Sequence, residues 1–241
     1  MKQLRKFKIF DNDILILFFL FIGFAQALTL NIGFPLKISE VCLFTLIFFM
    51  VLSGKIKLPN DKSFFILLIL LIFITLVSLL VNLFRSYPYN LDEYPSRFGY
   101  TFDNVFKFVY LILAFFALYF SYFAFKINLA KFTNYWIKGT LIACIISWFF
   151  LVSALLNIPS LPIPGMDEVP QTITLPFFGK VIRTGTFKEG NYMGLFLVIS
   201  ASVAFYRGKN KIGYFFLATI ITSFSSTGLA TGFIFLILFY F

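Results

Sequence analysis

The chain of 241 residues contains no histidine and only two cysteines, and charged residues make up only 12% of it. The absence of histidine excludes a histidine general base and a histidine-ligated metal site within this sequence. Cys42 and Cys144 both fall in apolar runs, so we expect packing residues rather than a disulfide or metal ligands. The glycine patterns that cradle nucleotide phosphates are absent too.

Apolar residues dominate what is present: hydrophobic residues make up 60% of the chain, and 38 residues are phenylalanine. A bilayer-spanning helix needs about 20 apolar residues, and runs of that kind follow one another here. They are apolar on all sides, unlike the alternating strands of a membrane barrel. The pattern predicts an all-α fold, a single transmembrane domain over 1–241 built as a polytopic helical bundle. The eight expected spans are roughly Ile14–Ile32, Ile38–Leu52, Phe64–Leu83, Val105–Phe125, Trp136–Leu156, Asn191–Tyr206, Ile212–Phe224 and Leu229–Phe241.

Two short breaks shape this expected bundle. The corner from Asn31 to Pro35 favours a helical hairpin over one long helix, because glycine and proline interrupt it. The polar segment from Ser225 to Gly228 is either a turn at the membrane surface or a kink within one longer helix. The first apolar run is too long for a typical signal peptide and is followed at once by another, so we expect a first helix that is retained.

The charges predict the orientation. With a cytoplasmic N-terminus, the inner segments carry 13 of the 20 Lys and Arg residues and 3 of the 10 acids, while the outer segments carry 7 of each. The whole net charge of +10 then lies inside, as the positive-inside rule expects. The basic residues are scattered over short turns, which argues against nucleic-acid binding. Glu40 is the only acid near a span interior, and its spacing from Lys37 predicts an interfacial ion pair.

Two outer loops remain as candidate sites, and the first covers residues 84–104. It mixes Arg85, Arg97 and acidic residues with several tyrosines. Such a mixture suits contact with a glycan through ring stacking and hydrogen bonds. It is equally ordinary for a loop at the level of the lipid headgroups, and the sequence leaves both interpretations open.

The second outer loop covers residues 157–190 and leads from a proline-rich, extended run into a helix. Arg183 and Lys188 form a cationic cluster just before that helix, where free N–H groups and the helix dipole attract anions. Arginine binds phosphate bidentately, and Gly185 and Gly190 let the backbone approach a ligand. The alternative is that Glu189 or Asn191 caps the helix while the two cations are solvated.

Two segments of this region resemble the O-antigen ligase and O-antigen polymerase superfamily. The first resembles its R-x-G-t-f-g-n-P-N-x-x-g segment through Arg183, Gly185, Thr186, Phe187, Asn191 and Gly194. The second, Thr222 to Gly228, falls where the family has l-T-x-S-R-g. The chain departs from the family where Gly190 replaces proline, and where Ser226 or Thr227 replaces the second arginine. Loss of that arginine favours the polymerase branch over the ligase branch.

The resemblance implies a bacterial, multi-pass inner-membrane enzyme of cell-surface polysaccharide or lipopolysaccharide biosynthesis. Such a glycosyltransferase moves a glycan from undecaprenyl diphosphate to an acceptor, either another lipid-linked glycan or lipid A–core. It uses no metal, no cofactor and no nucleotide sugar. Arg183 and then Lys188 are the residues that we expect to hold the diphosphate, with Gly185, Phe187, Glu189 and Asn191 in support. The catalytic base is not assigned.

Family members continue through further spans and a second large outer loop. We therefore expect residues 1–241 to be an N-terminal portion that is inactive by itself. Two other functional classes stay open: a transporter or flippase of lipid-linked oligosaccharide, and an accessory membrane subunit without chemistry. A flippase is expected to place ionisable residues at mid-membrane, and this chain keeps nearly all of its charge at the edges of the spans.

Overall fold

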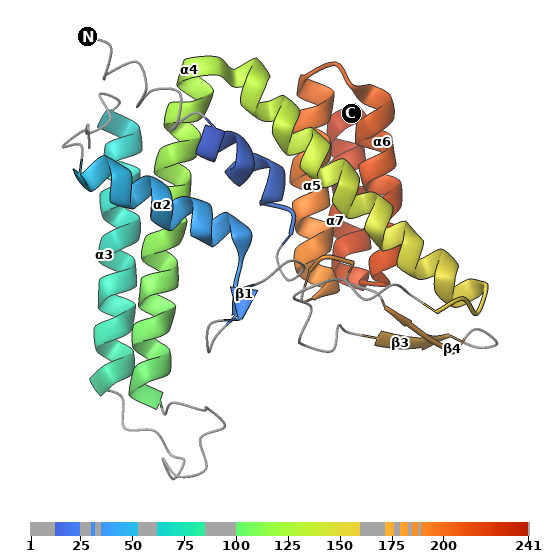
Figure 1. Cartoon of the computed structure of the whole chain (residues 1–241), viewed down its shortest axis with the longest axis horizontal. Helices are drawn as coiled ribbons and strands as arrows, with labels where there is room; N and C mark the ends of the chain where they lie inside the picture. Colours follow the sequence, from blue (N-terminus) through green and yellow to red (C-terminus); the bar gives the residue numbers. More distant parts are fainter. Residues whose placement is uncertain are drawn as a thin grey trace. The chain divides into compact units, whose positions relative to one another are not determined.

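The computed structural model of the protein describes residues 13–24, 30–31, 35–52, 62–84, 100–159, 172–175, 179–182, 185–187 and 189–240. Most of these residues are helical, so the structure agrees with the predicted all-α class (Figure 1). After a short helix at residues 13–21, the labelled helices are α2 (Ile38–Leu52), α3 (Lys62–Phe84), α4 (Tyr100–Leu155), α5 (Gly190–Tyr206), α6 (Asn210–Thr219), the 3₁₀ helix η2 (Ile220–Ser223) and α7 (Ser226–Tyr240). Two hairpins join them: β1 (Leu30–Asn31) with β2 (Pro35–Leu36), and β3 (Thr172–Leu175) with β4 (Gly179–Ile182).

Two helical stretches of the described chain are long and apolar enough to cross a membrane, Lys62–Val81 and Phe108–Leu155. The helices α2, α5 and α7 are apolar but shorter. Because the carbonyl and N–H groups of each helix bond within the helix, such segments need no water to satisfy their backbones. The coarser prediction of a membrane protein therefore has support, while the eight predicted spans are not shown by the described residues.

The predicted first span is wrong in extent. The helix at the start of the described chain covers only residues 13–21, where Ile14–Ile32 was expected. Gly23 lies in a turn, and Leu30 and Asn31 then pair with Leu36 and Pro35 in an antiparallel ladder. The helical hairpin expected around Asn31–Pro35 is therefore a small β-hairpin. Glu40 and Lys37 do form the predicted ion pair, at 3.3 Å, at the start of α2.

The predicted gap between the fourth and fifth spans is also different, because α4 runs through it. Asn128 alone leaves the helical region, with φ −158° and ψ 83°. Its side-chain oxygen accepts the N–H of Lys131 at 2.9 Å, which is the bond that an N-cap makes to the third residue of a new helix. Asn128 thus ends one helix and starts the next. At its other end α4 begins at Tyr100, so the first outer loop is shorter than the predicted 84–104.

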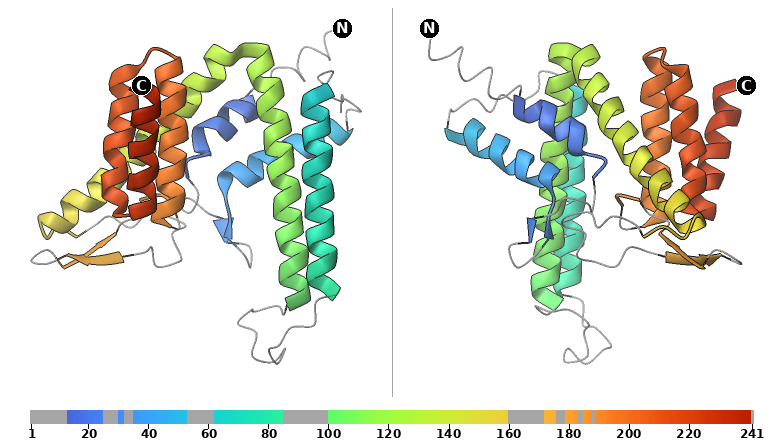
Figure 2. Two further views of the ribbon diagram at one scale, coloured as in Figure 1. Left: turned by 180° about the vertical axis from the view of Figure 1, so that it is seen from behind. Right: turned by 45° about the vertical axis from the view of Figure 1, so that its right-hand side comes forward.

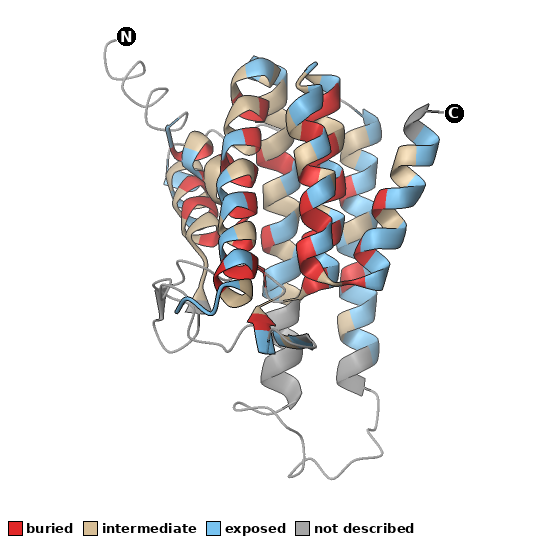
Figure 3. Cartoon of the chain, turned by 90° about the vertical axis from the view of Figure 1, so that its right-hand side faces the viewer, coloured by how far each residue is buried: buried red, intermediate tan, exposed pale blue. Residues whose placement is uncertain are grey.

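The chain divides into two compact units, one of Thr45–Phe123 and one of Met1–Phe44 with Ala124–Phe241. In the first, α3 lies antiparallel to the beginning of α4 (Figure 2), and the rings of Phe64 and Tyr122 stack at 4.3 Å. The side chains of α3 are largely apolar and exposed, with Phe73 and Ile74 each 61% exposed. Exposed positions follow the helices for long stretches (Figure 3). A continuous apolar surface of this kind calls for an apolar environment.

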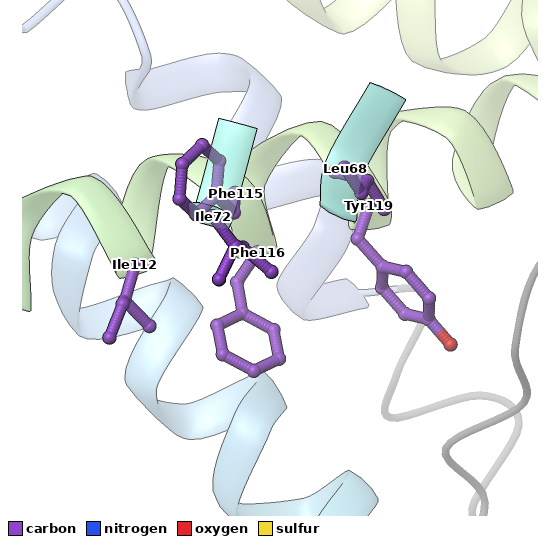
Figure 4. Close-up of a pocket in the computed structure, with 6 residues that line it drawn as sticks. All are labelled: Leu68, Ile72, Ile112, Phe115, Phe116 and Tyr119. Carbon is purple, nitrogen blue, oxygen red and sulfur yellow. The ribbon is translucent and has the colours of Figure 1, made fainter. Parts of the chain in front are cut away.

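A groove between α3 and α4 in this first unit has a volume of about 230 Å³. Its lining is apolar apart from the tyrosine hydroxyl (Figure 4), and consists of Leu68, Ile72, Ile112, Phe115, Phe116 and Tyr119. A glycan or a diphosphate needs several polar partners, which this lining does not supply. This groove is therefore not suited to either ligand. The described residues of the second outer loop belong to the second unit.

The core of the second unit is built around α5, which packs against α6 and α7 (Figures 1 and 2). Two indole N–H groups of α4 bond to hydroxyls on these helices: Trp136 to Ser200 at 2.8 Å, and Trp148 to Thr219 at 3.0 Å. Hydrogen bonds between helices are a common way to fix helix packing in an apolar setting. Both tryptophans therefore fix helix packing in the second unit.

Candidate functional site

The approach to the site is the β3–β4 hairpin, which lies inside the predicted second outer loop. Thr172 pairs with Ile182 and Leu175 with Gly179, so the two strands are antiparallel and in register throughout. Val181 is fully buried, while Gly179 and Lys180 beside it are exposed. The sequence predicted an extended loop but no strands. One buried side chain thus fixes the strand that leads toward Arg183.

Three buried residues, Gly185, Thr186 and Phe187, fix the chain between this hairpin and α5. Gly185 has φ +54° and lies so close to the Ser147 side chain of α4 that a Cβ there would overlap it. Thr186 Oγ1 donates to the carbonyl oxygen of Gly23 at 2.7 Å. Phe187 packs on Phe196, with ring centroids 5.2 Å apart. The G-T-F part of the first segment is therefore an anchor that is held by three other parts of the chain.

The N-terminus of α5 is open. Glu189 stands at the N-cap with extended φ/ψ, and its side chain makes no capping hydrogen bond. Its carbonyl accepts the N–H of Met193 at 3.2 Å, but within the described chain no acceptor faces the N–H groups of residues 190–192. Among the described residues these three donors are thus unpaired, and donors at the positive end of a helix dipole attract an anion. Of the two alternatives from the sequence, capping by the Glu189 side chain is thus not what the structure has.

Asn191 lies in the first turn of α5, and its side chain is engaged with the second segment. Ser225 Oγ donates to Asn191 Oδ1 at 2.6 Å. The same hydroxyl accepts the N–H of Gly228 at 3.1 Å, so Ser225 also caps α7. The residues that resemble the two family motifs are 34 positions apart in sequence and meet at this hydroxyl.

The segment from Thr222 to Gly228 contains a sharp turn, at Phe224 and Ser225, between η2 and α7. Phe224 adopts the left-handed conformation with φ +47°, and the N–H of Ser225 bonds to Ser223 Oγ at 3.3 Å. Of the two interpretations that the sequence left open, the turn is therefore the one that the structure has, rather than a kink in one helix. Ser226 and Thr227, where the family has arginine, are exposed in the first turn of α7.

Close backbone contact holds the starts of α5 and α7 together. A Cβ on Gly194 would lie 2.5 Å from Cα of Gly228, and one on Gly190 would lie 2.8 Å from the carbonyl oxygen of Ser223. Only glycine allows helices to approach this closely. The structure thus gives Gly190 and Gly194 packing roles at the same end of the helices where the open N–H groups lie.

Four of the expected site residues lie outside the described residues: Arg183, Lys188, Arg85 and Arg97. The nearest described residues are Ile182 and Gly185 on either side of Arg183, and Phe187 and Glu189 on either side of Lys188. Within the described residues, no group of three or more side chains comes together that could hold a metal ion.

Sequence reasoning missed two residues that shape this site, Ser147 and Ser225. Ser147 is an ordinary residue in an apolar run, so nothing in its surroundings marks it as the partner of Gly185. Ser225 did carry a signal, because a serine shortly before an apolar helix is typical of an N-cap. Its second role, the bond to Asn191, needs the tertiary structure.

No family model, curated protein or solved structure matches the chain. The function proposed below therefore rests on the residues and on the geometry described above.

Proposed function

We propose that the chain belongs to a polytopic membrane enzyme that transfers a glycan from undecaprenyl diphosphate to an acceptor, as a polymerase or a ligase of cell-surface polysaccharide. The observation that carries the proposal is the hydrogen bond from Ser225 to Asn191. It joins the two segments whose residues resemble the O-antigen ligase and polymerase superfamily. Segments that are separated in sequence and converge at one point are typical of a binding site.

The chemistry of the open helix end supports a diphosphate as ligand. Transfer of a glycan leaves negative charge on the departing diphosphate, and fixed donors and cations stabilise that charge in a partly dry site. The uncapped first turn of α5 supplies donors, and the cations Arg183 and Lys188 precede it by a few residues. Guanidinium and backbone N–H groups are the donors that phosphates prefer.

The length of α5 and the residues at its two ends support an orientation of this helix across the membrane. With 17 residues, α5 is about 25 Å long, which is close to the thickness of the hydrocarbon core. Glu189 lies at one end and the basic turn from Arg207 to Lys211 at the other (Figure 1). We propose that the basic turn is cytoplasmic and that the candidate site faces outward, in the inner membrane of a bacterium.

The flippase alternative has less support from the described residues. Among these, the buried polar side chains are serine and threonine hydroxyls, apart from Glu40. Glu40 is paired with Lys37 at the start of α2. A transporter of a charged glycan carrier is expected to line a cavity with ionisable groups at mid-membrane.

Substitution of Arg183 in the protein's own gene tests the proposal. Arg183→Ala should abolish glycan transfer while the protein still inserts, and Arg183→Lys should be strongly impaired because an ammonium cannot form the bidentate contact. Lys180→Ala is the matched control, since Lys180 is an exposed cation on β4 three positions earlier. Polysaccharide length and amount are measured on gels, alongside protein level in membranes. Full transfer by Arg183→Ala would refute the proposal and leave the accessory-subunit class.

A further inference from the structure

The turn between α5 and α6 is fixed against α4 at the end of the second unit opposite the candidate site (Figure 1). Gly208 has φ +68°, and the N–H of Lys209 bonds to the carbonyl of Ala204 at 2.8 Å, which is the pattern of a Schellman cap. Lys209 Nζ then donates to Asn134 Oδ1 of α4 at 2.6 Å. The backbone and the side chain of Lys209 are therefore both held in place.

This contact brings cations together. On α4, Lys131 and Lys138 lie three positions before and four positions after Asn134, so all three share one face of the helix. Lys138 lies over the ring of Tyr135, with Nζ 5.3 Å from the centroid. Lys131 Nζ lies 6.0 Å from the ring centroid of Phe132. Lys209, anchored on Asn134, thus adds a third lysine to the face of α4 that carries Lys131 and Lys138.

No carboxylate of the described residues balances this face. Three acids of the second unit are described: Asp13, Glu40 and Glu189. Glu40 is bound to Lys37, Glu189 starts α5 at the opposite end of that helix, and Asp13 forms no ion pair with a described residue. Like charges repel, and the repulsion grows where lipid lowers the dielectric constant. An external anion would relieve it.

Arg207 provides an independent sign of a missing partner. It stands at the C-terminal end of α5, two residues before Lys209, and its Nε is buried without a hydrogen-bond partner. It is the one buried side-chain nitrogen or oxygen within the described chain that lacks a partner. Buried polar atoms are nearly always satisfied, so an orphan donor two residues before the anchored Lys209 points to an acceptor from outside the protein.

We propose that Arg207, Lys209 and the Lys131–Lys138 face of α4 form a binding site for the phosphate of an anionic phospholipid headgroup. A phosphate diester offers the acceptor oxygens that a guanidinium and ammonium groups bind. The end of an apolar helix is where such headgroups lie, and anionic lipids of the cytoplasmic leaflet attract basic residues there. This inference rests on the proposed cytoplasmic position of the turn and does not depend on glycan transfer.

Lipid binding by the purified protein in mild detergent tests the inference. Native mass spectrometry with phosphatidylglycerol and with phosphatidylcholine measures the fraction bound, and we expect clear preference for the anionic lipid. Arg207→Gln should weaken phosphatidylglycerol binding by about tenfold, which is typical for loss of a charge-assisted contact. Lys138→Gln changes an exposed residue and should weaken phosphatidylglycerol binding as well. This second variant tests the site even if Arg207→Gln misfolds.

Lys180→Gln removes the same charge from the exposed strand β4 and should leave lipid binding unchanged. Equal losses in Lys180→Gln and in the two site variants would reduce the effect to net charge and overturn the inference. Equal binding of both lipids would overturn it too. Inorganic phosphate at the lipid's concentration should not compete. If it displaced the lipid, the site would be one for a free anion and the lipid assignment would be wrong.

Discussion

Ser225 donates a hydrogen bond to Asn191 at 2.6 Å and accepts one from the N–H of Gly228 at 3.1 Å, so a single hydroxyl joins α5 to the start of α7. Ser225 is buried, whereas its partner Asn191 is exposed. Because Asn191 lies in the first turn of α5, this hydroxyl also sets where the open N–H groups of α5 lie relative to α7. Stability and site geometry therefore depend on the same residue.

The first prediction is that Ser225→Ala destabilises the protein by about 1–2 kcal/mol, because it removes an N-cap and a bond between helices. Asn191→Ala should cost less, since it leaves the cap of α7 intact. The free energy of unfolding is measured for both single variants and for the double variant, which isolates the coupling between the two side chains.

Thr227→Ala is the matched control, because Thr227 is exposed in the same turn of α7 and should tolerate the change. Strict additivity of Ser225→Ala and Asn191→Ala would mean that the two side chains do not interact. That result would remove the observation on which the proposed function rests.

The second prediction concerns Gly185 and separates backbone strain from side-chain overlap. Gly185→Ala should be strongly destabilising: an alanine at φ +54° costs about 1–2 kcal/mol, and its Cβ also overlaps the Ser147 side chain. Gly179 has φ +76° with no atom within 4 Å of the position of a Cβ. Gly179→Ala should therefore show the backbone cost alone.

Replacing Ser147 by glycine in the Gly185→Ala background should recover the part of the loss that comes from overlap, typically about 1–3 kcal/mol. Thermal unfolding in detergent measures all three variants. If Gly185→Ala cost no more than Gly179→Ala, then the contact between Gly185 and Ser147 would not constrain the chain, and the G-T-F segment would not be an anchor.

The sequence predicted the helices where the apolar run decides the outcome. The bounds Ile38–Leu52 were predicted for α2 and observed, and α5 was predicted within one residue of its start. The predicted gap between the fourth and fifth spans is wrong because a local polar contact decides the structure there. Asn128 restarts the helix within α4 through its bond to Lys131, whereas hydropathy alone placed a polar gap there.

The candidate site was predictable only in part. Helix-end chemistry marks the start of α5, and composition marks the cations before it, because both are properties of neighbours in sequence. The partners of Gly185, Thr186 and Asn191 come from residues 38, 163 and 34 positions away. Nothing in a single sequence pairs such positions, since each partner is a small residue whose own surroundings do not indicate its distant contact.

The last prediction is the membrane orientation of α5. If α5 spans the bilayer, its two ends must lie on opposite sides. The predicted topology places 13 of the 20 basic residues on the same side as the turn from Arg207 to Lys211. Reporter fusions at Lys55 and Lys209 should be cytoplasmic, and a fusion at Met166 should be exported. Each position is tested with two reporters, one active only in the cytoplasm and one active only after export, so that every result has an internal control.

Export at Lys209 with a cytoplasmic Met166 would invert the topology. Fusions at Lys209 and Met166 on the same side would mean that α5 does not span, and the candidate site would then have no fixed position relative to a lipid-linked substrate.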